Sequence, residues 1–241
     1  SLMGAESCLA LKTPQEFLAQ TEQYVSKRYA SVQSLALPRE HFAASAQRPL
    51  KRLGLVSGDI GQHPVGYFTS GLLRHIKPML EKEGIELFIF STRAPRFYDE
   101  TTTYFQKLEY HWRDLHGLSN PEAIEVIRAE QIDILLDLSG HTLGDQLSAF
   151  AARCAPVQGS WLGYYASTGI ANMDYLLGDN IVAPLVAASE EPSVYTEQVA
   201  RFPNAYGCFD PPQDSPAVSA SPAQENGFIT FGNFNNLIKM T

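Results

Sequence analysis

The amino-acid sequence predicts an α/β fold with a Rossmann-like, mostly parallel sheet. From residue 50 onward, short apolar runs of strand length alternate with longer stretches whose apolar residues recur at helical spacing. Several apolar runs are followed at once by glycine and polar residues, as in 56–64, 137–144, 155–169 and 231–239. Alternation of this kind favours strands joined by right-handed helical crossovers, with helices on both faces of the sheet.

The composition is that of a globular protein able to bury a core: of 241 residues, 44% are hydrophobic and 18% are charged. This length suits one large α/β domain or two small ones. The formal net charge of −8 leaves no basic footprint for nucleic acid, and no cluster of Lys and Arg indicates a membrane surface. No apolar run approaches the roughly 18 residues of a membrane span, and the first residues lack the pattern of a secretory signal.

Several common ligand motifs are absent from the sequence. There is no G-x-G-x-x-G after the first predicted strand, which disfavours a nicotinamide dehydrogenase, and there is no Walker A or D-x-D motif. The three cysteines, Cys8, Cys154 and Cys208, are far apart and have no metal-ligand spacing, so we expect reduced thiols and a cytoplasmic location. We therefore expect chemistry without a metal ion or a resident cofactor.

Residues 1–47 are predicted to form an N-terminal helix and a linker. The helix is expected over 11–33, with Thr13 as its cap and an apolar stripe of Phe17, Leu18, Val25 and Tyr29. Residues 34–49 mix Pro, Ser, Ala and charged residues without a period, which is typical of a linker.

The α/β region begins with residues 53–57, a short apolar run that predicts a buried strand. A helix with one apolar face follows over 66–83, and a second strand over 85–90. Residues 101–108 are predicted to be helical, and 110–112 to form a weak strand.

The next helix is predicted over 119–129, capped by Ser119 or Asn120 with Pro121 in its first turn. Residues 132–138 are the clearest central strand. A helix over 145–153 and strands at 157–162 and 173–177 complete a lobe that we place at 48–222.

Residues 210–225 are rich in Pro, Ser and Ala and have no period, which favours a domain boundary there. A new strand is predicted at 228–232, so 223–241 are assigned to the start of a second lobe. Thr241 has the position of a helix cap without a helix, and we expect the chain to be the front part of a larger protein.

The loops after the strands should meet at one edge of the sheet, where open α/β sheets bind ligands. His63 is either a structural loop residue or a general base there. His141 either contacts a ligand or orients its loop by a backbone hydrogen bond, and Asp137 is expected to cap a neighbouring loop. Lys239 is either a solvated lysine or a cation that stabilises a phosphate beside a helix N-terminus.

Taken together, these segments resemble a known family, the O-linked N-acetylglucosamine transferases with their SPINDLY-like relatives. The resemblance runs over 46–241 and rests on five segments, His63–Phe68, Ile132–Thr142, Ala155–Tyr164, Met173–Tyr175 and Thr230–Lys239. It implies the N-terminal catalytic lobe of a two-lobed GT-B enzyme, with the active site between its lobes. It also implies inverting, metal-independent transfer of a sugar from a nucleotide sugar, UDP-N-acetylglucosamine above all, to Ser or Thr of a protein or peptide.

The resemblance also implies the roles of individual residues. His63 is similar to the family's base or acceptor-orienting histidine, and Lys239 to the lysine that neutralises the donor diphosphate. The other residues expected to bind substrate are Pro64, His141, Thr142, Gly163, Tyr164 and Asn236. The chain departs from the family at Tyr165–Ala166, where Pro-Gly is usual, and it lacks the tetratricopeptide repeats that present protein substrates.

Two other functions remain open at this stage. One is a nucleotide-sugar epimerase of similar architecture, which would need a pair of acid–base carboxylates; no such pair stands out. The other is a protein-binding module without a second lobe. Most donor contacts in GT-B enzymes come from the second lobe, so the 241-residue chain alone is predicted to have no measurable transfer activity.

Overall fold

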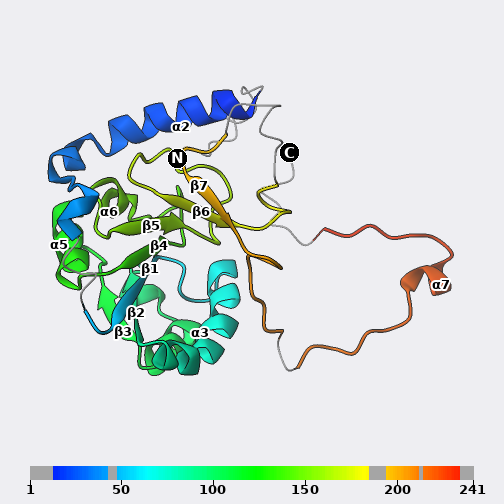
Figure 1. Ribbon diagram of the computed structural model, residues 1–241. Helices are drawn as coiled ribbons and strands as arrows, with labels where there is room; N and C mark the ends of the chain where they lie inside the picture. Colours follow the sequence, from blue (N-terminus) through cyan, green and yellow to red (C-terminus); the bar gives the residue numbers. More distant parts are fainter. Residues whose placement is uncertain (1–12, 43–47, 185–193, 212–213, 234–241) are drawn as a thin grey trace. The chain divides into compact units, whose positions relative to one another are not determined.

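The structure, a computed structural model, describes residues 13–42, 48–184, 194–211 and 214–233. The chain forms two compact units, Ser1–Asp210 and Pro211–Thr241. The first unit holds every strand and all helices but one among the described residues (Figure 1). The fold described below is that of the first unit.

The first unit is built on one parallel sheet of seven strands in the order β3-β2-β1-β4-β5-β6-β7. The chain moves outward in one direction from β1 to β3 and in the other direction from β4 to β7. The order therefore reverses between β1 and β4, which is where doubly wound sheets bind ligands. The strands are β1 (Lys51–Ser57), β2 (Ile85–Ser91), β3 (His111–Asp114), β4 (Ile134–Asp137), β5 (Val157–Ser160), β6 (Tyr175–Gly178) and β7 (Gln198–Arg201).

Helices cover the two faces of the sheet, and each face has its own hydrophobic core. Phe88 and Phe90 of β2 contribute to one core, whereas Leu87 and Ile89 contribute to the other, because successive side chains on a strand point to opposite faces. The first core also contains residues of α2 (Pro14–Arg28), α5 (Asn120–Ala129) and α6 (Leu147–Ala151), and the second contains residues of α3 (Pro64–Lys82) and α4 (Glu100–Lys107). The predicted α/β class is thus confirmed.

The N-terminal helix α2 begins directly after Thr13, the cap that the sequence predicts. Thr13 accepts a hydrogen bond from the Glu16 amide at 3.1 Å, and Glu16 accepts one from the Thr13 amide at 3.0 Å, which makes a capping box. The α-helix ends at Arg28, and a 3₁₀-helix, η1 (Ala30–Leu35), follows it. The prediction of one helix to residue 33 was therefore wrong. In the 3₁₀-helix, Val32 is buried in the core.

Other differences from the predicted elements lie mainly after residue 178. Strand β7 was not predicted, because it has four residues and alternates exposed with half-buried positions. The stretch predicted to be irregular contains α7 (Pro222–Asn226). The strand predicted at 228–232 was wrong: these residues are exposed and irregular, and the described part of the second unit offers no strand with which they could pair.

Candidate functional site

The loops after β1 and β4 lie side by side at the carboxyl edge of the sheet. The hydroxyls of Ser57 and Ser139 are 3.2 Å apart, and the Gly58 amide donates to Ser139 Oγ at 3.4 Å. The loop after β2 joins them, since the Thr92 hydroxyl donates to the Gly144 carbonyl at 2.6 Å. The expected meeting of strand ends is therefore present, at the point where the strand order reverses.

Asp137, the last residue of β4, holds the following loop in place. Its carboxylate accepts hydrogen bonds from the amides of Gly140 at 2.7 Å and Ser139 at 3.3 Å, and its side chain is buried. Burial raises the pKa of Asp137 to about 7, with Asp145 and Asp59 acting in the same direction, while the two amides lower it. Asp137 caps its own loop, which is close to the expected role.

The pKa of Asp137 predicts a pH dependence of stability. Because the folded-state pKa is raised to about 7, the contribution of Asp137 is complete below its ordinary pKa of about 4 and is lost as the pH rises to 7. Between pH 5 and 7, the free energy of unfolding of the wild type should fall by up to about 1.4 kcal/mol per pH unit relative to that of Asp137→Asn. Urea unfolding of both proteins across this range measures the difference. Parallel curves would show that Asp137 ionises at its ordinary pKa.

The loop after β5 approaches the end of β4 closely at Gly163. A Cβ atom added to Gly163 would lie 2.0 Å from the backbone oxygen of Leu138, so only glycine fits. The preceding Leu162 is buried and has a φ of 71°, a left-handed conformation that costs a leucine energy. Tyr164 packs beneath Gly140, whose own Cβ would lie 2.2 Å from that of Tyr164. Gly163 and Tyr164 thus join the loop after β5 to the loop after β4.

His141 is buried behind this loop and does not face solvent. Its Nε2 lies 2.8 Å from the Thr168 carbonyl, and the rings of Tyr24 and Tyr164 pack edge-on against it. Burial lowers the pKa of His141, which favours the neutral ring. The position matches the loop-orienting alternative; a direct contact with substrate stays a prediction. Thr142, beside it, is exposed and donates from its hydroxyl to a backbone carbonyl at 3.0 Å.

Glu197, a buried carboxylate that the sequence did not single out, supports the segment that holds His141. Glu197, directly before β7, accepts hydrogen bonds from the Ser167 hydroxyl and the Thr168 amide, each at 2.7 Å, and from the Thr168 hydroxyl. Thr168 in turn holds His141. Because β7 was not predicted, nothing in the sequence placed Glu197 near residues 167 and 168.

His63 lies at the start of α3, where its side chain caps the helix. The Val65 amide donates to His63 Nδ1 at 3.3 Å, and Asp59 Oδ1 lies 3.8 Å from the same nitrogen. The ring remains 43% exposed. Pro64 occupies the first position of the helix, where its missing N–H costs nothing. His63 and Pro64 thus lie at the end of the loop after β1, on the expected edge of the sheet.

Tyr165 stands where the family usually has proline, and it adds an exposed aromatic ring to the loop after β5. It is 55% exposed, and its hydroxyl lies 2.7 Å from that of Tyr206. The rings meet edge-on. The ring of Tyr165 is thus supported by that of Tyr206.

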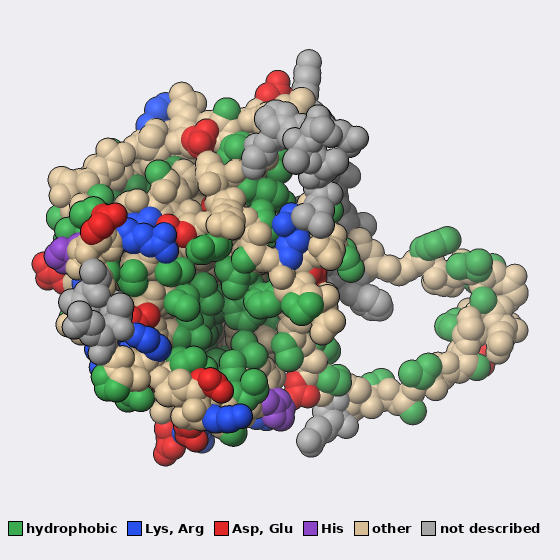
Figure 2. Space-filling view, in the orientation of Figure 1, with side chains coloured by type: hydrophobic (Ala, Val, Ile, Leu, Met, Phe, Trp, Pro, Cys, Tyr) green, Lys and Arg blue, Asp and Glu red, His purple; other side chains and the backbone are tan. Residues whose placement is uncertain are grey.

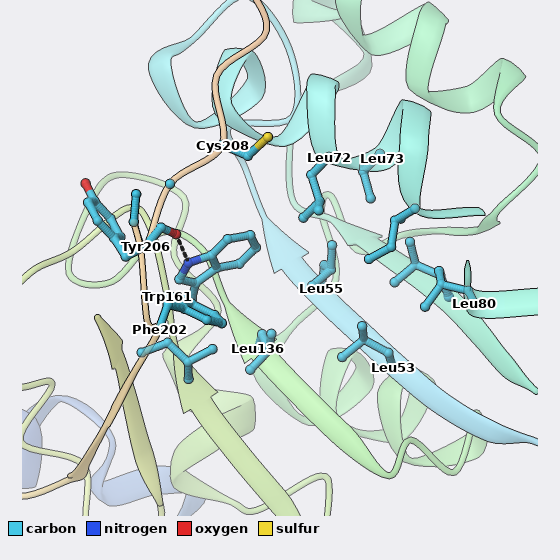
Figure 3. Close-up of a pocket in the computed structure, with 15 residues that line it drawn as sticks. Leu53, Leu55, Leu72, Leu73, Leu80, Leu136, Trp161, Phe202, Tyr206 and Cys208 are labelled. Carbon is cyan, nitrogen blue, oxygen red and sulfur yellow. Dashed lines mark hydrogen bonds between the residues drawn. The ribbon is translucent and has the colours of Figure 1, made fainter. Parts of the chain in front are cut away.

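A cavity of about 370 Å³ lies on the face of the sheet, away from the His63 loop. Figure 2 shows the hydrophobic side chains gathered in this hollow, and Figure 3 shows leucines of β1 and α3 facing Trp161 and Phe202 across it. The indole N–H of Trp161 donates a hydrogen bond to the Tyr206 carbonyl at 2.8 Å. A charged diphosphate needs polar partners, so this apolar hollow is not the candidate site.

Two of the predicted site residues, Asn236 and Lys239, lie outside the described residues, and their roles stay predictions. Among the described residues, no three His, Cys, Asp or Glu side chains gather as a metal site requires. No helix in the described ranges combines the length and hydrophobicity needed to cross a membrane.

The parallel sheet and the joined loops at its carboxyl edge define a Rossmann-like lobe of the doubly wound class. The model of Glycosyl transferase family 41 matches residues 29–217, and the chain belongs to this family.

Named relatives agree with the family match. The chain is 34% identical, over 81% of its length, to a protein of Solanum lycopersicum named "Probable UDP-N-acetylglucosamine--peptide N-acetylglucosaminyltransferase SPINDLY". It is 29% identical, over 90% of its length, to a protein of Arabidopsis thaliana with the same enzyme name and the designation SEC. These alignments cover 20% and 23% of the relatives, so the chain spans about a fifth of their length.

A solved structure extends the likeness to three dimensions. A mutant O-GlcNAc transferase of Thermobaculum terrenum superposes with a TM-score of 0.70 and 32% sequence identity. The match covers 88% of this chain and 38% of the other. The chain therefore shares both the sequence pattern and the fold of a glycosyltransferase lobe.

Proposed function

We propose that a protein containing this chain transfers N-acetylglucosamine from UDP-N-acetylglucosamine to Ser or Thr of proteins, and that the chain is the N-terminal lobe of a GT-B catalytic unit. One observation carries the proposal. The segments that resemble the transferase family, around His63, Gly140 and Gly163, are the ones whose loops meet at the carboxyl edge of the sheet. A cytoplasmic location accords with the buried Cys154 and exposed Cys208, which are both free thiols.

In the proposed mechanism this lobe provides the acceptor side of the site. His63 orients or deprotonates the acceptor hydroxyl, and the Gly163–Tyr164 loop positions the sugar for in-line attack. Lys239 and neighbouring backbone amides stabilise the leaving diphosphate as its negative charge develops, without a metal ion. Transfer proceeds with inversion at the sugar carbon.

The test is a donor screen with the longest natural protein that contains this sequence. A panel of UDP- and GDP-sugars is offered with acceptor peptides, and incorporation is read by mass spectrometry. Transfer of N-acetylglucosamine from its UDP donor supports the proposal. Transfer from another nucleotide sugar alone would contradict the donor, and no transfer from any donor would contradict the enzyme class.

Lys239→Ala should weaken binding of the nucleotide diphosphate by about tenfold to a hundredfold, because each charge-assisted hydrogen bond contributes about 1.5–3 kcal/mol. Transfer should suffer more than binding, since the leaving group gains charge in the transition state. Lys239→Arg should rescue only partly, because its planar fork meets a phosphate differently. Titration calorimetry with UDP and GDP measures the affinities. Equal affinity in all three proteins would remove Lys239 from the site.

A further inference from the structure

His63 has two competing partners at one ring nitrogen. The Val65 amide, an obligatory donor, points at Nδ1 from 3.3 Å, within hydrogen-bonding distance. The Asp59 carboxylate, which can only accept when ionised, lies 3.8 Å from the same atom, beyond that distance. The described residues place no hydrogen bond on Nε2.

The two partners require opposite protonation states of Nδ1. A neutral imidazole carries one proton, and Nδ1 can accept from the Val65 amide only if that proton is on Nε2. A proton on Nδ1 breaks this cap and requires an acceptor instead, which Asp59 supplies. A general base that takes its proton at Nε2 needs the Nδ1–H form, and the helix cap opposes that form.

We propose that neutral His63 acts as a hydrogen-bond donor through Nε2–H to an oxygen of the substrate, and that Asp59 is a positioning residue that receives Nδ1–H only when the ring is protonated. The state of the ring follows from the geometry of the chain alone. That the acceptor of Nε2–H belongs to a substrate rests on the proposed function. No proton is transferred by His63 in this role.

The surroundings of Asp59 support its part. Burial raises the pKa of Asp59, while His63, Arg93 and the Ser139 hydroxyl lower it. The guanidinium of Arg93 is itself engaged by Asp99 at 2.7 Å, and Asp99 also accepts from the Gln62 amide. The loop that carries Asp59 and His63 is thus held from a neighbouring element, with Asp59 as the carboxylate next to Nδ1.

The first experiment reads the protonated nitrogen directly. Heteronuclear ¹⁵N NMR of the 241-residue chain distinguishes the two neutral forms of a histidine ring, and His63→Gln assigns the His63 signals among the six histidines. When the signals show a neutral ring, we expect its proton on Nε2. A proton on Nδ1 would overturn the proposal. Because no activity is needed, this result is independent of the proposed function.

The second experiment tests Asp59. The pH is lowered until the NMR signals of His63 show that its ring carries both protons. The Nδ1 proton should then be protected from solvent exchange by Asp59 and visible, and in Asp59→Ala it should exchange too fast to be seen. Equal visibility in both proteins would show that Asp59 does not receive this proton.

The third experiment uses transfer activity of the longest natural protein. The amide nitrogen of a glutamine reaches about where Nε2 lies, whereas that of an asparagine reaches only to Nδ1. His63→Gln should therefore keep at least tenfold more activity than His63→Asn, because only glutamine retains the donor. Equal losses in both variants would favour a base. If no wild-type transfer is found, the proposed function fails while the NMR result stands.

Discussion

Replacing His63 by alanine in the longest natural protein that contains this sequence is expected to lower kcat by about 100-fold or more. Loss of one positioned donor and loss of a general acid–base group both have effects of about this size or larger. Steady-state kinetics against donor and acceptor concentration measure the change, and kcat should fall more than KM rises if the contact strengthens in the transition state.

The control for His63→Ala must separate loss of the contact with substrate from loss of the helix cap. His63 caps α3 through Nδ1, so alanine also removes a cap that contributes about 1 kcal/mol to stability. Asparagine is a favoured cap residue, and His63→Asn should restore the stability but not the activity. Near-wild-type kcat in His63→Ala would instead return His63 to a structural role.

Gly163→Ala is expected to destabilise the chain by about 3 kcal/mol or more. The added Cβ would lie 2.0 Å from the Leu138 carbonyl oxygen, and this neighbour is backbone of a central strand end that cannot rotate away. For a chain of this size, the loss should lower the melting temperature by about 6–12 °C. Thermal and urea unfolding of the 241-residue chain measure the effect.

Gly207→Ala is the matched control for Gly163→Ala. At Gly207 the nearest atoms to an added Cβ are 3.6 Å away, an ordinary contact, and φ lies outside the left-handed region. We expect its unfolding free energy to change by less than about 1 kcal/mol. Similar stability of both variants would mean that the loop after β5 moves away from β4 at little cost.

The sequence by itself determined the class of fold and the order of its main elements. The runs that became β1, β2 and β4 are apolar and of strand length, and the helices between them show an apolar face of period 3.6, because burial acts on neighbouring residues along the chain. The same local logic located His63 at the end of β1 and the glycine loop after β5. It failed for β7 and for 228–232, where the pattern is short and the outcome depends on a partner strand.

Only the tertiary structure decided what the polar residues of the edge do. His141 is separated by 27 residues from the Thr168 carbonyl that holds it, and Glu197 by 29 from Thr168. The hydrogen bonds of Asp137 to Gly140 and of His63 to Val65 are local in sequence, but the burial of Asp137 requires the packed sheet. Burial, and the hydrogen bonds of His141 and Glu197, depend on distances between atoms far apart in sequence. Such distances exist only once the sheet has brought its strand ends together.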